Sequence, residues 1–468
     1  LDVSEVFSTY LYDGTGSALT VNNGIDLTEG GLVWLKSRTD NGIHTFYDTE
    51  RGAQKVLSSN STGAQGSDAG GGSTAGLYQF NSNGFSVGAD WAGNGNNASN
   101  DYVSWTFRKA EKFFDVVNFT GTGQNGQQVA HNLGVAPGII IIKGISNSSN
   151  WSVFVTDVTS YPACLDLSSS SDTTNTYDQY GGSATIIQLN GNGSNYIAKN
   201  GQTYVAYLFA NNNGDGNFGP NADQDIIKVG SYTGNGSSNG PVIDLGFEPQ
   251  WLMLKASSVG QASDDWYMVD NMRSFEALPL HDNGSQFLAA NETAAETGTG
   301  QYQRVASNPT GFSLGSGTGW NANGETYVYI AIRRGPLAPP EVGTEVFDVN
   351  TAAGGGAGQT ITTGFPVDLT LVKNRTASNT EWEAWDRVRG SGEYLFPSAP
   401  DAGGALSYQW QYSKNMTSFT WRLADGYANS GGTFVDYNWR RAGGYFDAAA
   451  YSGSGSNRTQ AHNLGVAP

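Results

Sequence analysis

Apolar residues of this chain gather in strand-sized runs, separated by clusters of glycine, proline, asparagine and serine. Glycine and asparagine supply the positive φ angles that tight turns need, so this spacing favours many short strands over long helices. The runs IIIIK at 139–143 and WLMLK at 251–255 are apolar almost throughout. Such continuous runs are typical of strands that are covered on both faces.

Other runs alternate between the two faces of a strand. In YVSWTF at 102–107, residues 102, 104 and 106 point one way and residues 103, 105 and 107 the other. This period of two predicts a half-buried strand, with one face packed and one face towards water.

The pattern repeats at intervals near 110 residues. Four apolar runs end in a lysine, at Lys36, Lys143, Lys255 and Lys373, so the successive spacings are 107, 112 and 118 residues. Each run follows a turn-rich opening such as FDVVNFTGTG from Phe114. An aromatic strand comes after it, and a closing strand of the YVSWTF type comes last. A fixed period of this kind indicates tandem structural repeats.

We therefore expect an all-β chain, a tandem array of β-sandwich domains of the jelly-roll type. A chain of 468 residues is also too long for one hydrophobic core. The predicted units, called repeats 1 to 5 below, are 1–113, 114–225, 226–345, 346–445 and a truncated opening at 446–468.

The segments that join the repeats are short, and the third contains Pro336, Pro339 and Pro340. Short and proline-rich joints limit swing, so we expect a jointed rod. Repeat 4 departs most from the pattern: it has SFTWRLADG where repeats 1 and 3 have GFSVG at Gly84 and GFSLG at Gly311. Its late strands are therefore in doubt.

Charge and composition exclude some classes of function. The 42 acidic and 24 basic residues give a net charge of −18, which opposes binding to nucleic acid through phosphate neutralisation. No run approaches the roughly 20 apolar residues of a membrane helix, so no membrane insertion is expected. The single cysteine, Cys164, cannot form an internal disulfide and is expected to be a small core residue.

Nucleophilic catalysis would need a serine or cysteine beside an oriented histidine. His131 and His462 occupy the same place in a repeated AHNLG turn, and repeats 1, 3 and 4 have other residues there. We interpret both as turn residues that hydrogen-bond locally. His44 and His281 have no motif around them.

Paired carboxylates of a glycoside hydrolase are the strongest enzymatic alternative. An acid follows the aromatic strand of each repeat, at Asp48, Asp157, Asp270 and Asp386. An arginine follows three residues later in repeats 1, 3 and 4, at Arg51, Arg273 and Arg389, whereas repeat 2 has Ser160. Recurrence in diverged copies favours a structural task, such as capping a turn or pairing with the arginine. No catalytic residue is assigned.

Metal and ligand sites have weak signals. The stretch from 211 to 225, with Asp215, Asp223 and Asp225, is rich in oxygen ligands but lacks the spacing of a helical calcium loop, and a solvated turn between repeats is the favoured interpretation. No cysteine or histidine cluster supports zinc. We predict no cofactor and leave calcium open.

Trp91 and Trp320 follow the GFSVG and GFSLG segments, in stretches that are rich in glycine and asparagine. They are candidate ligand contacts that could stack on sugar rings, and burial at the sandwich edge is the alternative.

Taken together, NLGVAPGIIIIK, the aromatic strand ending in Asp48, GFSVG and YVSWTFRKA resemble repeats of tail- or fibre-like virion structural proteins of marine tailed bacteriophages. The resemblance implies an extracellular virion component without enzymatic activity that contacts other virion proteins and a host-surface glycan. It also implies a homo-oligomer, as fibres in general are. The alternatives are a capsid or tail decoration protein, a bacterial adhesin or filament subunit, and, last, a glycan-degrading enzyme. Recognition is expected in the loops between the Lys36-type and Tyr102-type strands.

Overall fold

The computed structural model describes residues 1–468 with internal gaps. The ranges outside the description are 90–94, 157–164, 166–178, 191–196, 258–264, 274, 276–285, 299–303, 354–358, 377–379, 391–392, 400–403, 406–412, 415, 422–431 and 452.

Repeat 1 consists of two antiparallel sheets. The larger has the order β1 (Phe7–Asp13), β9 (Asp101–Arg108), β3 (Gly31–Ser37) and β4 (Thr45–Asp48), and the smaller has the order β2 (Leu19–Asn22), β8 (Gly84–Val87) and β7 (Leu77–Asn81). A short hairpin of β5 (Lys55–Val56) and β6 (Gly66–Ser67) completes the repeat, with 3₁₀ turns at Val3–Glu5, Leu27–Glu29 and Asp68–Gly71.

Repeats 2 and 3 have the same strand order, and repeat 3 adds two strands at the edge of its larger sheet. In repeat 2 the larger sheet is β10 (Phe114–Thr120), β16 (Thr203–Ala210), β12 (Pro137–Gly144) and β13 (Ser152–Val155), and the smaller is β11 (Gln127–Ala130), β15 (Ile186–Asn190) and β14 (Gln179–Gly182). Repeat 3 has β17 (Ile227–Thr233), β25 (Thr326–Arg333), β19 (Pro249–Ala256), β20 (Tyr267–Asp270), β21 (Gln286–Ala289) and β22 (Thr297–Gly298), beside β18 (Val242–Asp244), β24 (Gly311–Leu314) and β23 (Val305–Asn308). The helix α1 (Thr318–Asn321) precedes β25.

Repeat 4 keeps this plan, including the late strands that its sequence left in doubt. Its larger sheet is β26 (Phe347–Ala353), β34 (Thr433–Trp439), β28 (Leu369–Asn374), β29 (Glu383–Asp386), β30 (Glu393–Leu395) and β31 (Gly404–Ala405). Its smaller sheet is β27 (Gln359–Thr362), β33 (Ser418–Trp421) and β32 (Ser413–Lys414), and a 3₁₀ turn at Gly343–Glu345 precedes it. SFTW at 418–421 thus takes the place of GFSV.

The two sheets of each repeat face each other across an apolar core. In repeat 1, Val33 and Tyr102 of the larger sheet pack with Val21 and Phe85 of the smaller one. Repeats 3 and 4 have corresponding clusters. The chain is therefore an all-β array of sandwiches, as the alternating runs predicted.

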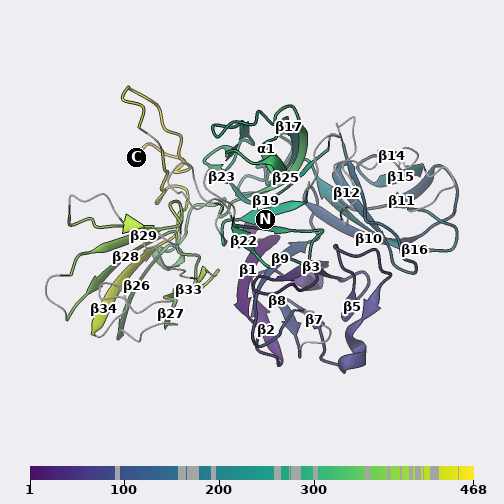
Figure 1. Cartoon of the computed structure of the whole chain (residues 1–468), viewed down its shortest axis with the longest axis horizontal. Coiled ribbons are helices and arrows are strands. Elements are labelled where there is room, and N and C mark those ends of the chain that lie inside the picture. The colour runs from purple at the N-terminus through teal and green to yellow at the C-terminus, as the bar shows by residue number, and fades with distance from the viewer. Residues whose placement is uncertain are drawn as a thin grey trace.

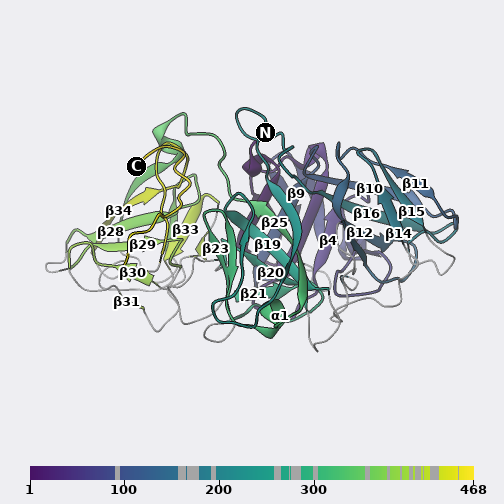
Figure 2. The ribbon, with the colours of Figure 1, turned by 90° about the horizontal axis from the view of Figure 1, so that it is seen from above.

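Repeats 1 to 3 do not form a rod. Their larger sheets turn towards one another and share one core, in which Phe107 contacts Phe209 of repeat 2 and Trp251 of repeat 3, with ring centroids 5.5 and 5.8 Å apart. Figure 1 shows the three repeats grouped around this centre, with repeat 4 to one side, and Figure 2 shows the same arrangement from above. We name repeats 1 to 3 the three-repeat body.

This packing also corrects the prediction for the closing strands. All six central residues of β9 are buried, so neither face of that strand meets water. The side chains at 103, 105 and 107 pack on the neighbouring repeats. In β34 of repeat 4, by contrast, buried and half-buried residues alternate.

The opening of repeat 5 shares two local contacts with the opening of repeat 2. Bridges join Ala442 to Phe446 and Ala110 to Phe114. The Asn463 amide donates to the Asp447 carboxylate at 2.6 Å, as the Asn132 amide donates to Asp115 at 2.7 Å.

Candidate functional site

Among the described residues, the two most completely buried ion pairs lie where repeats meet. Asp48 ends β4 and forms a 2.6 Å ion pair with Arg51, and these side chains are 0% and 1% exposed. The Tyr207 hydroxyl, from β16 of repeat 2, donates to the same oxygen of this carboxylate, Oδ2, at 2.7 Å. A charge-assisted hydrogen bond therefore joins repeats 1 and 2 inside their shared core.

The surroundings keep the Tyr207 hydroxyl and the Arg51 guanidinium protonated. Burial raises the pKa of the Tyr207 hydroxyl well above its usual value, so the group remains a donor. Burial alone would lower the pKa of Arg51, but the neighbouring Tyr207 and Asp48 outweigh burial and raise it. Arg51 also donates to the carbonyl oxygens of Phe46 and Lys55, which fixes the turn after β4.

The same unit recurs between repeats 3 and 1. Asp270 ends β20 and pairs with Arg273 at 2.7 Å, and both side chains are fully buried. The indole nitrogen of Trp105, from β9 of repeat 1, donates to the Asp270 carboxylate at 3.1 Å. Strand register places Trp105 and Tyr207 at the same position of their repeats. One interface is therefore used twice, from repeat 1 to repeat 2 and from repeat 3 to repeat 1.

The third interface, from repeat 2 to repeat 3, replaces this unit by apolar residues. Register places Val155 at the position of Asp48 and Asp270, and Ile330 at that of Trp105 and Tyr207. Both are buried in the shared core. Our alignment of Asp157 with the other acids is therefore wrong by two residues. The sequence does not show this offset, which only the pairing of β12 with β13 reveals. Asp157 and Ser160 lie outside the described residues.

Loops outside the shared core join the same pairs of repeats. The Gln65 amide of repeat 1 donates to the Ile145 carbonyl of repeat 2 at 3.0 Å, and the Glu296 amide of repeat 3 donates to the Arg38 carbonyl of repeat 1 at 2.8 Å. Arg38 and Glu296 also form a 2.7 Å ion pair. Part of the variable loops expected to recognise ligands therefore holds repeats together.

A second cluster of buried charges joins repeats 3 and 4. Glu248 of repeat 3 pairs with Arg441 at 2.8 Å and with Arg334 at 3.1 Å. Asp368 of repeat 4 pairs with Arg387 at 3.0 Å, and Arg387 donates to the Asn271 carbonyl of repeat 3 at 3.1 Å. Two carboxylates and three guanidinium groups thus lock the joint.

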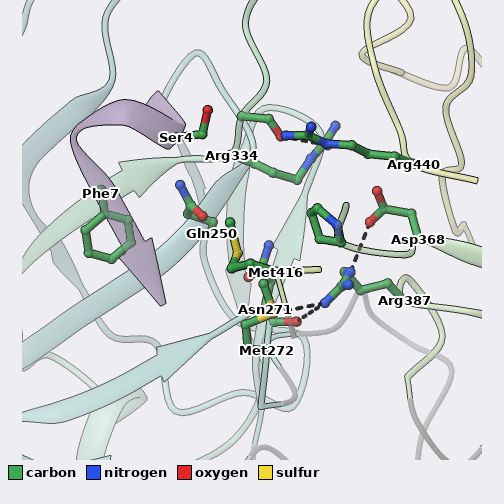
Figure 3. A pocket seen from close by; sticks show the side chains of 12 residues that line it. Ser4, Phe7, Gln250, Asn271, Met272, Arg334, Asp368, Arg387, Met416 and Arg440 are labelled. Carbon is green, nitrogen blue, oxygen red and sulfur yellow. Dashed lines mark hydrogen bonds and ion pairs between the residues drawn. The ribbon is translucent and has the colours of Figure 1, made fainter. Parts of the chain in front are cut away.

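Beside this joint lies a pocket with an empty volume of about 430 Å³, which includes solvent at its mouth. Figure 3 shows that Ser4 and Phe7 of repeat 1, Gln250 and Asn271 of repeat 3, and Asp368 and Arg387 of repeat 4 surround it. Burial would raise the pKa of Asp368, but the charges of Arg441, Arg387 and Arg334 outweigh burial and lower the pKa to about 2. The carboxylate is therefore held as an ionic partner of the arginines, which is a structural task.

The predicted ligand contacts have different outcomes. Trp91 lies outside the described residues. Trp320 is only 4% exposed, and its ring meets Tyr267 edge-on at 5.3 Å in the core of repeat 3. Its ring therefore cannot stack on a sugar, and of the two interpretations of Trp320 the structure supports burial. Helix α1, which the glycine-rich sequence did not reveal, turns the indole inward.

The histidine interpretation is confirmed for both AHNLG turns. His131 and His462 accept the amide hydrogens of Leu133 and Leu464, each at 3.2 Å. His44 is buried and accepts the indole hydrogen of Trp34 at 2.9 Å. His281 and Cys164 lie outside the description.

In the stretch from 211 to 225, for which calcium was left open, an aspartate binds backbone amides. Asp225 accepts the amide hydrogens of Gly214 and Gly216, each at 2.8 Å. Within the described ranges, no group of three or more metal-ligating acids, histidines or cysteines is found. Nor does any helix in that part of the chain have the length and apolar character needed to span a membrane.

Comparison with protein families gives one match, over residues 2–336, to a domain of unknown function, DUF7483. The chain belongs to this family. The DUF7483 match spans repeats 1 to 3 and ends in the segment before repeat 4, so it coincides with the three-repeat body. No curated protein and no solved structure matches the chain.

Sequence reasoning found the recurring acid and arginine but missed their partners. Tyr207 and Trp105 are ordinary members of alternating strands, and nothing local marks them as donors. One sequence feature connects them: each lies two residues after the valine of a Tyr-Val pair. This shared position indicates a common role only once the structure shows that the repeats face each other.

Proposed function

We propose that this DUF7483 protein is a structural component of a bacteriophage virion without enzymatic activity, a tail fibre or appendage that presents β-sandwich repeats to the host surface. The observation that carries the proposal is the use of the recurring Asp–Arg unit. Asp48 and Asp270 are fully buried and bind the neighbouring repeat, so the acids that recur most regularly serve assembly of the chain.

Three further features support this function. The shared core of the three-repeat body and the ionic joint to repeat 4 give a rigid support for exposed loops. The net charge of −18 suits an extracellular surface protein that stays soluble. The sequence motifs resemble those of virion proteins of marine tailed phages.

The test is mass spectrometry of purified virions from an infected culture, with labelled antibody and electron microscopy to locate the chain. Peptides of the chain in gradient-purified particles at constant stoichiometry are the expected result. Their absence from particles, together with their presence on uninfected cell envelopes, would replace the proposal by a bacterial adhesin.

Enzymatic activity is tested separately. The purified protein is incubated with host polysaccharide, and new reducing ends are measured. We expect none. Release of reducing ends that Asp386→Asn abolishes, without a change in circular dichroism, would restore the glycosidase alternative, because Asp386 is the least buried of the described acids in this set.

A further inference from the structure

Repeat 4 leaves open the sheet face that repeats 1 to 3 bury. We name the outward side of its larger sheet the outer face, which consists of Phe347, Val349, Leu369, Leu371, Tyr437 and Trp439. Strand register aligns these residues with Phe7, Thr9, Leu32, Trp34, Trp105 and Phe107 of repeat 1. All six residues of repeat 1 are at most 2% exposed, whereas Val349 is 44% exposed and the other five of repeat 4 are half-buried.

The outer face is one continuous apolar surface. Phe347 and Trp439 have ring centroids 5.3 Å apart, and Tyr437 lies 6.3 Å from Trp439 and 6.1 Å from Trp382. Contiguous apolar patches of this kind on soluble proteins mark interaction sites. The three-repeat body shows what this face binds elsewhere in the chain, namely the same face of two other repeats.

Repeat 4 also carries both halves of the polar unit that joins repeats. Asp386 pairs with Arg389, and Arg389 donates to the Ala384 carbonyl, as Arg51 donates to the Phe46 carbonyl. Among the described residues only Arg389 donates to the Asp386 carboxylate, whereas Asp48 and Asp270 each also accept from a neighbouring repeat. Tyr437 stands at the register position of Tyr207, the donor of that bond.

We infer that the outer face of repeat 4 binds the outer faces of two other copies of this chain, which gives a homotrimer around three copies of repeat 4. In each interface the Tyr437 hydroxyl of one chain donates to the Asp386 carboxylate of the next. The contact joins two different surfaces of the repeat, so it closes into a ring only if its rotation allows. The three-repeat body shows that this rotation closes after three repeats.

The choice of other chains as partners follows from repeat 4 itself, which presents both the acceptor, Asp386, and the donor, Tyr437, of the hydrogen bond that joins repeats, so copies of this repeat complement one another. The three equivalent faces of repeats 1 to 3 are occupied by one another. In the part of the chain that is described, repeat 4 alone has such a face open. The inference concerns assembly and does not depend on whether the protein belongs to a virion.

The experiment measures the mass of the full chain by light scattering and sedimentation from about 0.1 to 100 µM. Trimers that dissociate only on dilution are expected. Leu371→Asp should abolish association, and Tyr437→Phe should raise the dissociation constant by roughly 10-fold or more, because each interface loses a hydrogen bond to a charged acceptor. Circular dichroism of each variant shows that the fold is retained.

The matched control is Val242→Asp, which places a charge on an exposed valine of β18 that is outside the outer face and 71% exposed. It should remain trimeric. A monomer at every concentration, a dimer, an open filament, or a trimer that persists in Leu371→Asp would each overturn the inference. A normal dissociation constant in Tyr437→Phe would overturn the Tyr437–Asp386 contact.

Discussion

The interface between repeats 1 and 2 allows a demanding test of how a buried ionic unit stabilises the fold. The perturbation is Asp48→Val. It leaves the Arg51 guanidinium, which is 1% exposed, without its carboxylate, and leaves the Tyr207 hydroxyl without its acceptor. Removal of one partner from a buried ion pair costs about 3–5 kcal/mol, because the remaining charge stays desolvated. Tyr207→Phe, which removes only the hydroxyl, should cost about 1.5–3 kcal/mol.

The third interface of the same chain suggests substitutions that should restore the stability lost in Asp48→Val. The third interface has Val155 and Ile330 at the corresponding positions, and Val158 stands three residues after Val155 in the sequence. The triple variant Asp48→Val, Arg51→Val, Tyr207→Ile therefore copies Val155 and Ile330 of an interface that this fold already accepts, together with the valine that the sequence has three residues after Val155. It should recover most of the stability that Asp48→Val loses, since replacing all polar partners by apolar groups leaves none unsatisfied.

The assay is urea denaturation of the full chain at pH 7, followed by tryptophan fluorescence and circular dichroism. Trp105 and Trp251 lie in the shared core and report on the three-repeat body. The reasoning fails if Asp48→Val loses less than about 1 kcal/mol, or if the triple variant is less stable than the single one. Either result would mean that the ion pair does not hold the interface.

Three further predictions concern repeats 3 and 4. Arg441→Ala should loosen the joint and lower the unfolding temperature of repeat 4 in calorimetry, because Glu248 and Asp368 lose a buried partner; the exposed Arg375→Ala is its control. Burial raises the pKa of Asp436 from 3.8 to about 6, so the folded repeat holds a proton that the unfolded chain has lost. Stability should therefore fall by up to about 3 kcal/mol as pH rises from about 4 to 6, and Asp436→Asn should flatten this slope in urea titrations. Trp320→Ala should cost about 3–5 kcal/mol in the same titrations, and an unchanged midpoint would contradict its place in the core.

The sequence alone determined the repeat and its strands. Apolar runs bounded by turn residues predicted β12 and β19, and the AHNLG turns predicted local hydrogen bonds at His131 and His462. These features depend on neighbours within one repeat, where side-chain period and turn chemistry act directly.

Only the tertiary structure decided how the repeats contact one another. The 102–107 run alternates in polarity, and its sequence cannot say whether the second face meets water or another repeat. In repeat 1 other repeats cover that face, and in repeat 4 it stays open, although both strands have the same period. The offset of Asp157 is equally invisible without strand register. Alternation reports which side chains share a face, whereas the partner of that face depends on contacts between residues more than a hundred positions apart.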